Sequence, residues 1–510
     1  MSTSHWLLRF LSLEIIAVLV FISSLLHSMT LGRDIAFVSG KVVVLLSHKA
    51  MHDMISVDQF VPVVNNVDKR RVGDSRQPTP AGIAWTRIYN ATTNHLLPSH
   101  GVSSSLARHS DYGTDIAIDP GGNLYLTGGW HSAQFGAVWS RQEAFNYFVA
   151  KTDPNGVGVW FNEIDSGLSV EDSGISLSLD GNGNLYVLGR SAGNTVDQRI
   201  VVNGNAFVYF LVKYDNDGKQ QWIHTVSGNA RTAVDLVTNL NGDSFVLGYV
   251  EAKSNREAGH IFVQKYNAAG AQRWDKKVLV STKSQSMSSV QGNAMCADND
   301  GALYIAGTEI NANTLAKKDV TDVVVIKLSQ DGRNIWQRKY GTPGRDYASA
   351  ISYNAAAGQV VLAGYSPGKI VNYTGQGGTK YDFVAALSPR NGEPLWTSKL
   401  SVEDGGMHYT AIASDNTGNV HLTGRYGENG TPEFGLGNAI LYAKLTSKGE
   451  LVRFNVMGTK NTRDNGNGIA VDKYGDFYIT GSTGGDLNGI RSDASLLASD
   501  LFITKNMPNP

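Results

Sequence analysis

One short pattern recurs seven times along the chain and restricts its fold more than any other feature. The strings NLYLTG, NLYVLG, DSFVLG, ALYIAG, QVVLAG, NVHLTG and DFYITG end at Gly128, Gly189, Gly248, Gly307, Gly364, Gly424 and Gly481. Successive copies lie 57 to 61 residues apart. Self-similarity at so even a period is the signature of a repeat architecture. We therefore expect an array of similar structural units.

Each unit contains four short stretches that alternate like β-strands. The first stretch, such as ISLSLD, is followed by a turn rich in Asp, Asn and Gly, and the second ends at one of the glycines above. The third reads like YFVAK, and most fourth stretches carry a tryptophan: Trp160, Trp222, Trp274, Trp336 and Trp396. Period-two alternation between turn residues indicates strands. Four strands in about sixty residues make one propeller blade, so we predict an all-β, seven-bladed β-propeller of four-stranded blades.

The two ends of the repeat region predict a closed ring. The seventh unit stops after LFITK, at Lys505, without a fourth stretch, whereas GIAWTRIYN, with Trp85, precedes the first unit. If the Trp85 strand completes the last blade, no open sheet edge remains between the ends. We therefore assign residues 81–510 to a propeller closed by the Trp85 strand. In the sixth fourth stretch, Leu451 or Phe454 stands where tryptophan is expected.

A hydrophobic segment precedes the repeats. The run from Ile15 to Leu26 is uncharged, and its length lies between that of a signal-peptide core and that of a membrane-spanning helix. We predict an N-terminal hydrophobic helix within residues 1–32, acting as a signal-anchor or a signal peptide; a buried helix without a targeting role is the third interpretation. Residues 33–80 match no repeat and are interpreted as a linker or stalk. The chain should thus be membrane-anchored, extracytoplasmic or secreted.

The repeat resembles a known family. The best copies are DPGGNLYLTGG at Asp119, DGNGNLYVLG at Asp180 and VDKYGDFYITG at Val471. Together with the D-x-F-V-A-K and Trp stretches that follow, this pattern resembles the SBBP beta-propeller repeat family. The resemblance covers Gly82 to about Lys505. It implies a propeller on secreted or cell-surface proteins and brings no catalytic set with it.

Composition excludes several classes of function. The net charge is −1, so no basic excess exists to bind nucleic acid. Cys296 is the single cysteine, which rules out an internal disulfide, a cysteine zinc site and c-type haem attachment. We expect Cys296 to be a buried, inert thiol and the chain to be a monomer.

Two motif types raise the question of cofactors. Turns such as DNDG at Asp215 suggest calcium, but neither this turn nor the one at Asp180 has the glycine that an EF-hand loop requires at position six. Turn formation explains them, so we expect no cofactor and no metal ligands, with calcium as the remaining alternative. The Trp stretches also resemble those of quinoprotein dehydrogenases; packing between blades is the structural alternative.

One set of residues could meet at the propeller axis. Counting back fourteen residues from the aromatic position of the second stretch gives Asp111, Asp172, Arg231, Val290 and Asp464. Asp346 lies one residue off this register, and His408 follows Met407 in the sixth unit. Because first strands usually line a propeller channel, the axial candidates for ligand binding are Asp111, Asp172, Arg231, Asp346, His408 and Asp464. Turn capping by each Asp is the alternative.

The sequence favours a non-catalytic platform that binds a protein or carbohydrate, with the membrane contacted through the N-terminal segment. The alternative is a propeller enzyme with a metal- or quinone-dependent site at the central axis. Convergent acids or histidines at the axis would favour the enzyme, and a broad exposed surface on one face would favour the platform.

Overall fold

The computed structural model describes residues 33–38, 41–46, 83–89, 111–130, 146–164, 172–191, 195–196, 200–201, 207–226, 231–251, 259–278, 289–310, 320–342, 344–366, 381–400, 406–427, 437–487 and 499–506. The hydrophobic segment at the N-terminus lies outside them, so the predicted helix stays a prediction. Within the described part of the chain, no helix combines the length and apolar character needed to span a membrane. The chain divides into two compact units, 1–66 and 67–510.

The first unit contains a small antiparallel sheet. Strands β1 (Arg33–Val38) and β2 (Lys41–Leu46) pair along their whole length, with Arg33 opposite Leu46 and Val38 opposite Lys41. This hairpin falls inside the segment that we interpreted as a linker or stalk. The boundaries proposed from the sequence, at residues 32 and 80, remain predictions.

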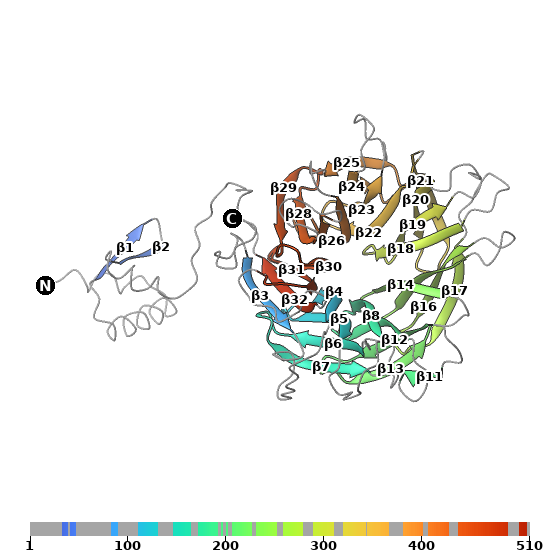
Figure 1. The fold of residues 1–510 in the computed structure, drawn as a ribbon, viewed down its shortest axis with the longest axis horizontal. Helices are drawn as coiled ribbons and strands as arrows, with labels where there is room; N and C mark the ends of the chain where they lie inside the picture. The colour runs from blue at the N-terminus through green and yellow to red at the C-terminus, as the bar shows by residue number, and fades with distance from the viewer. Residues whose placement is uncertain are drawn as a thin grey trace. The chain divides into compact units, whose positions relative to one another are not determined.

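The second unit consists of seven four-stranded antiparallel sheets, the blades, arranged as a ring (Figure 1). Blades 1 to 3 contain β4 (Tyr112–Ile118), β5 (Leu124–Trp130), β6 (Asn146–Thr152) and β7 (Gly158–Ile164); β8 (Ser173–Leu179), β9 (Leu185–Ser191), β12 (Val208–Tyr214) and β13 (Gln220–Thr225); and β14 (Arg231–Thr238), β15 (Ser244–Val250), β16 (His260–Tyr266) and β17 (Gln272–Val278). Between β9 and β12, β10 (Thr195–Val196) and β11 (Ile200–Val201) form a separate pair.

Blades 4 to 6 repeat this order. They contain β18 (Ser289–Ala297), β19 (Leu303–Ile310), β20 (Thr321–Leu328) and β21 (Asn334–Tyr340); β22 (Tyr347–Asn354), β23 (Gln359–Ser366), β24 (Tyr381–Leu387) and β25 (Pro394–Leu400); and β26 (Met407–Ser414), β27 (Val420–Tyr426), β28 (Ala439–Leu445) and β29 (Leu451–Met457). Blade 7 contains β30 (Asn465–Val471), β31 (Phe477–Thr483), β32 (Asp500–Asn506) and β3 (Ile83–Tyr89). The seven-bladed, all-β prediction is confirmed.

Blade 7 is built from both ends of the ring. β3 pairs antiparallel with β32, which places Trp85 opposite Lys505 and Tyr89 opposite Leu501. The strand before the first repeat therefore supplies the fourth strand of the last blade, as predicted. This pairing joins segments more than 400 residues apart, as the bond from Thr86 Oγ1 to Thr504 Oγ1 illustrates (3.0 Å).

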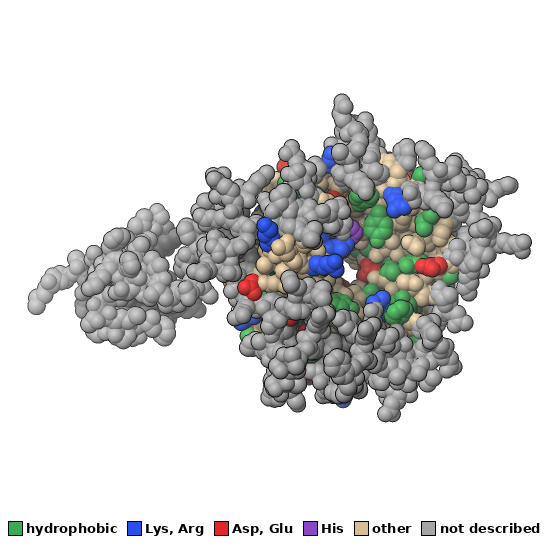
Figure 2. Space-filling view, viewed as in Figure 1, with side chains coloured by type: hydrophobic (Ala, Val, Ile, Leu, Met, Phe, Trp, Pro, Cys, Tyr) green, Lys and Arg blue, Asp and Glu red, His purple; other side chains and the backbone are tan. Residues whose placement is uncertain are grey.

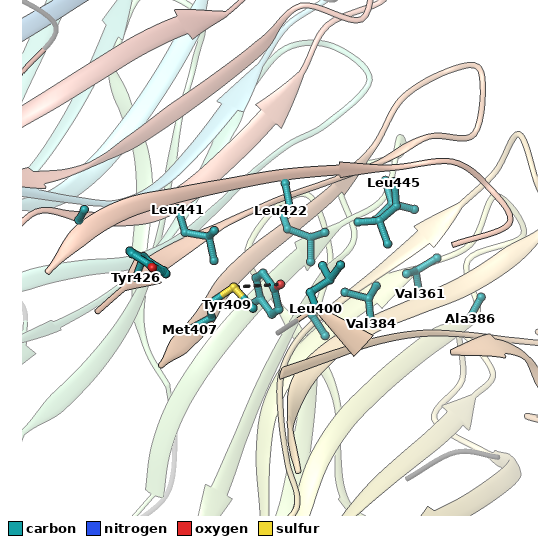
Figure 3. Close-up of a cluster of buried hydrophobic side chains, with 14 residues drawn as sticks. Val361, Val384, Ala386, Leu400, Met407, Tyr409, Leu422, Tyr426, Leu441 and Leu445 are labelled. Carbon is teal, nitrogen blue, oxygen red and sulfur yellow. Dashed lines mark hydrogen bonds between the residues drawn. The ribbon is translucent and has the colours of Figure 1, made fainter. Parts of the chain in front are cut away.

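First strands lie at the centre of the ring, and each packs against the first strands of its neighbours (Figure 1). The hydrophobic core lies between the blades. One cluster combines Val361, Val384 and Leu400 of blade 5 with Tyr409 and Leu422 of blade 6 (Figure 3). Both faces of the inner strands are therefore covered, which explains why second strands such as LYLTGGW are buried at every position.

Tryptophans of the fourth strands join each blade to the next. The indole N–H of Trp160 donates to the Asn216 carbonyl of blade 2 (3.0 Å), and Trp396 donates to the Ser447 carbonyl of blade 6 (2.8 Å). The Trp160 ring also packs on Gly218, where a Cβ would approach ring carbon Cδ2 to 2.7 Å and φ is +79°. A turn glycine is needed there for space and for backbone conformation.

Blade 6 departs from this pattern, and the residue named from the sequence was wrong. In the other fourth strands the tryptophan pairs with the third strand where Trp160 faces Lys151. In blade 6 this register places Arg453 opposite Lys444, so neither Leu451 nor Phe454 takes the Trp position. The other blades have the same register shift, and the tryptophan follows the turn glycine by four residues, as Trp160 follows Gly156. Arg453 follows Gly449 at this spacing. Arg453 lies over the Tyr442 ring instead.

Candidate functional site

Five of the six axial candidates can be placed directly by the β-bulge that interrupts every first strand. In blades 1 to 7 the residue before the bulge is, in order, Gly113, Gly174, Ala233, Gly292, Ala348, Tyr409 and Gly466. The residue two positions earlier is Asp111, Asp172, Arg231, Val290, Asp346, Met407 or Asp464. Asp346 is therefore in register, because the one-residue offset comes from a longer hairpin turn in blade 5. Met407 occupies the equivalent position in blade 6, and His408 follows it.

Asp346 and Asp464 are fully buried and cap the connections that lead into their own strands. Asp346 accepts hydrogen bonds from the Thr342 N–H (2.5 Å) and the Ser366 hydroxyl (2.5 Å). Asp464 accepts from the Thr459 N–H (2.9 Å), among other donors. Burial raises the pKa of both carboxyls, and these hydrogen bonds oppose the rise. Their contacts match the turn-capping alternative, although they are buried rather than exposed. Ligand binding by either residue stays a prediction.

Asp111 and Asp172 are likewise buried. The N–H of Asp111 donates to the Ser499 carbonyl of blade 7 (2.7 Å), just as the N–H of Asp346 donates to the Thr321 carbonyl of blade 4 (2.9 Å). The two acceptors, Ser499 and Thr321, lie at the starts of the third strands β32 and β20, away from the innermost strands. These two hydrogen bonds place the starts of β4 and β22 between neighbouring blades.

Arg231 and His408 are half-buried and differ from the aspartates. The guanidinium of Arg231 contacts Asp275 of the outer strand β17 (2.6 Å) and lies over the Phe262 ring (4.5 Å). Its charged end thus points outward along its own blade. His408 pairs in the sheet with Arg425 of β27. The structure does not bring the six candidates together as one group of contacting side chains.

A different set of residues faces the axis. The residue that directly follows each bulge is Asp115, Ser176, Asp235, Ala294, Ala350, Ala411 or Gly468. Asp115, Asp235, Ala294 and Ala411 are half-buried although they belong to the innermost strands. In the space-filling view the middle of the ring is hollowed, and acidic and apolar side chains are visible there (Figure 2).

Asp115 and Asp235, which we call the axial acid pair, are connected through Ser176. The Ser176 hydroxyl lies 3.1 Å from Asp115 Oδ2 and 2.9 Å from Asp235 Oδ1. Each carboxylate also accepts a backbone N–H from the following blade: Asp115 from Leu177 (2.9 Å) and Asp235 from Met295 (2.7 Å). The acid pair therefore links four consecutive blades.

The two carboxyls have raised pKa values. Burial raises the pKa of Asp115 to about 7, and the nearby charge of Asp235 adds to the rise against the opposing effect of the Leu177 N–H. Burial raises the pKa of Asp235 to about 6, and the Met295 N–H opposes it. Carboxyls with pKa values near 7 can exchange protons at physiological pH, which is the property of general acids and bases.

Counting along the sequence missed this pair by four residues. Asp115 and Asp235 stand in the strings DIAID and VDLVT, which the alternation identified correctly as first strands. The sequence did contain a signal: across the seven units, these are the only two acidic residues inside a first strand. What the sequence could not show is that both reach the same serine of blade 2.

A second polar cluster lies in blade 6. His421 is fully buried between Asp415 (Nε2 to Oδ2, 3.2 Å) and the Tyr442 hydroxyl (Nδ1 to Oη, 3.2 Å). The order resembles a catalytic relay, but tyrosines hold the equivalent position elsewhere, and the Tyr186 hydroxyl donates to Asp180 in the same way (3.3 Å). We therefore interpret His421 as the local substitute for a turn-binding tyrosine.

Metal-ligating side chains do not gather in the described part of the chain: it contains no group of three His, Cys, Asp or Glu residues placed to hold one ion. The Cys296 thiol is half-buried beside the axis, and burial raises its pKa well above the ordinary value. Such a thiol stays protonated and is a weak nucleophile.

Comparisons with known proteins agree with the fold. The SBBP beta-propeller repeat family matches residues 457–488, and a family described as outer membrane protein assembly factor BamB matches residues 293–426. No curated protein sequence matches the chain.

Several solved structures are distantly similar to the chain. They include a gluconolactonase of Xanthomonas campestris (TM-score 0.34, 10% identity, 67% of this chain and 90% of that chain), a periplasmic gluconolactonase of Pseudomonas aeruginosa (0.39, 13%, 73% and 90%) and the polysaccharide lyase Uly1 (0.42, 12%, 80% and 92%). Such scores add nothing about activity. The chain is a seven-bladed β-propeller that carries a repeat of the SBBP family.

Proposed function

We propose that this chain is a non-catalytic, exported or membrane-anchored propeller that serves as an interaction platform. Its partner, a protein or a carbohydrate, would bind the face at which second strands end and third strands begin. We call this the loop face; the opposite side, where first strands turn into second strands, is the turn face.

The observation that carries the proposal is the difference between these two faces. Hairpins on the turn face are short and alike. Asp180 caps one by accepting the Asn184 N–H (2.9 Å), and Asp215 caps another by accepting the Lys219 N–H (2.9 Å). Glycines with positive φ close both turns, at Gly183 and Gly218. Structural demands account for these residues.

Connections on the loop face differ from blade to blade. In blade 3 the second strand ends at Val250 and the third begins at His260, whereas in blade 7 the corresponding residues are Thr483 and Asp500. Long, unequal connections on a rigid scaffold are where binding functions concentrate. The family model that matches residues 293–426 is described as an assembly factor for outer membrane proteins, so a protein is the first class of partner to test.

Site-specific photo-crosslinking in the source cells tests this assignment. Ile310 and Tyr347 are exposed on the loop face (38% and 37%), while Leu240 and Tyr474 are exposed on the turn face (78% and 74%). A photoreactive residue at the loop-face positions should give adducts of one defined mass, and the turn-face positions should not. Adducts from the turn face alone would contradict the proposal.

Export depends on the N-terminal segment. We propose that the run from Ile15 to Leu26 delivers the chain to a membrane. Fractionation of cells with full-length tagged protein should place it in membranes or outside the cytosol. A wholly cytosolic full-length chain would refute export while leaving the binding face open.

One observation favours the alternative, an enzyme with a site at the axis. Asp115 and Asp235 have pKa values near neutrality and share one hydroxyl, an arrangement that suits acid–base chemistry or a cation such as calcium. Metal analysis and thermal unfolding with calcium distinguish the two functions. The enzyme predicts bound metal, or stabilisation that Asp115→Asn abolishes; the platform predicts neither.

A further inference from the structure

The axial acid pair has fewer protons than its hydrogen-bonding contacts require when both carboxyls are ionised. Ser176 has one hydroxyl proton, yet its oxygen lies within hydrogen-bonding distance of both Asp115 and Asp235. If both carboxyls are ionised, only one of these contacts can be a hydrogen bond. The other then brings two oxygen lone pairs together about 3 Å apart, which is unfavourable for polar groups deep in a protein.

Backbone donors do not supply the missing proton. Asp115 Oδ1 accepts the Ile116 N–H (2.8 Å), and Asp235 Oδ1 accepts the Leu236 N–H (2.8 Å). Their Oδ2 atoms accept N–H groups of the next blades. These donors hold the carboxyls in place but leave the two contacts to Ser176 with a single proton between them.

We propose that Asp115 and Asp235 hold one additional proton in common through Ser176, and that this proton acts as a pH-sensitive latch between blades 1, 2 and 3. With the proton bound, one carboxylic acid donates to the serine oxygen, and the serine hydroxyl donates to the other carboxylate. Every contact of the pair is then a hydrogen bond. When the proton leaves, one contact between neighbouring blades becomes repulsive.

Few other charges face the pair from the strands packed around it. Cys296 of β18 interacts with Asp235 as a neutral thiol. β8 and β30 contain no charged residue. Four of the remaining charged side chains of the packed strands contact other groups: Arg231 meets Asp275, Lys505 meets Asp476, Lys151 lies over the Tyr125 ring and Arg190 lies over the Phe207 ring. Asp500 is the first residue of β32, opposite Thr483 in the sheet.

The pKa values agree with this geometry. Burial raises the pKa of Asp115 to about 7 and that of Asp235 to about 6, and the charge of Asp235 contributes to the rise at Asp115. Groups whose pKa is raised by folding contribute stability that is complete below the unfolded value, near 3.9, and is lost as pH rises through the folded value. The latch should therefore be closed at pH 5 and open above about pH 7.

Unfolding of the full-length chain between pH 5 and 8.5 tests the proposal. One shared proton changes the unfolding equilibrium constant by up to about tenfold per pH unit. Asp115→Asn and Asp235→Asn should each remove this whole dependence, because the Ser176 hydroxyl then donates to the single remaining carboxylate, which needs no second proton. Asp217→Asn, at an exposed turn position, is the matched control and should keep the wild-type slope.

Independent carboxyls give a different result. In that case the wild type releases two protons over this range and Asp235→Asn still releases one from Asp115, so the variant keeps about half of the wild-type slope, which overturns the shared proton. Infrared difference spectra of the wild type keep the test decisive if a variant does not fold. The carbonyl band of a protonated carboxyl should disappear between pH 5.5 and 8.5, and its persistence or absence throughout would refute the latch.

Discussion

The seven first strands have the same backbone, yet the two halves of the axis differ in chemistry. Blades 1 to 3 place Asp115, Ser176 and Asp235 after the bulge, whereas blades 4 to 6 place alanine and blade 7 places Gly468. Bulges form equally in both halves. The fold of the repeat therefore does not require the carboxylates, and their presence in one half is a property of this chain's axis.

The two halves also meet in a close contact between the first strands of blades 7 and 1. A Cβ on Gly468 would lie 3.0 Å from Asp115 Cα and 3.1 Å from the Ile116 nitrogen. Both neighbours are backbone atoms, which cannot move as a side chain can. Blades 7 and 1 thus meet in a close backbone contact beside Asp115.

Gly468→Ala should have the largest effect, because it breaks this close approach. The added methyl group must push β4 away from β30, and overpacking of this kind costs about 1–3 kcal/mol. Denaturant unfolding measures the loss. Ala411→Ser, which adds a hydroxyl at the equivalent, half-buried position of blade 6, is the control. Equal stability of Gly468→Ala and the wild type would show that the strands separate freely.

Ala411→Asp should give the next largest effect, by extending the polar half. The new carboxylate would stand two blades from Asp115, the same separation as between Asp115 and Asp235. A third axial charge raises the pKa of its neighbours, so the variant should lose about 1–2 kcal/mol more at pH 8.5 than at pH 5.5. Ala411→Asn carries no charge and should lose the same amount at both pH values; a pH-independent Ala411→Asp would argue against an electrostatically coupled axis.

Local patterns made the blades predictable from sequence. Strand alternation, the turn residues and the unmatched Trp85 strand each identify structure from neighbouring residues, and the pairing of β3 with β32 follows from counting strands. β-Bulges and turn lengths are not predictable from local patterns in this way. The position of Asp115 depends on a one-residue bulge, and that of Asp346 on a turn one residue longer. Neither feature changes the alternation pattern.

The acid pair was out of reach for a further reason. Asp115, Ser176 and Asp235 are one repeat period apart, so the spacing gives them equivalent positions in consecutive blades. It does not show that a bulge directly before these positions brings their side chains into contact. The candidates Asp111, Asp172 and Asp464 were chosen at the correct strands, but four residues before the position that faces the axis.

His421→Gln should have the smallest effect and should sharpen the comparison between the two halves. Burial lowers the pKa of His421, against its hydrogen bond to Asp415. A histidine with a lowered pKa contributes stability above its unfolded pKa, near 6.5, and loses it as pH falls below that value. This change opposes the gain that the axial acid pair makes on acidification. Glutamine can still donate to Asp415 but does not titrate. On acidification from pH 8 to pH 5 the free energy of unfolding should therefore rise more in the variant than in the wild type, by less than about 1 kcal/mol. Identical pH profiles would mean that folding leaves the pKa of His421 unchanged, and the wild-type slope would then report the axis without a contribution from this histidine.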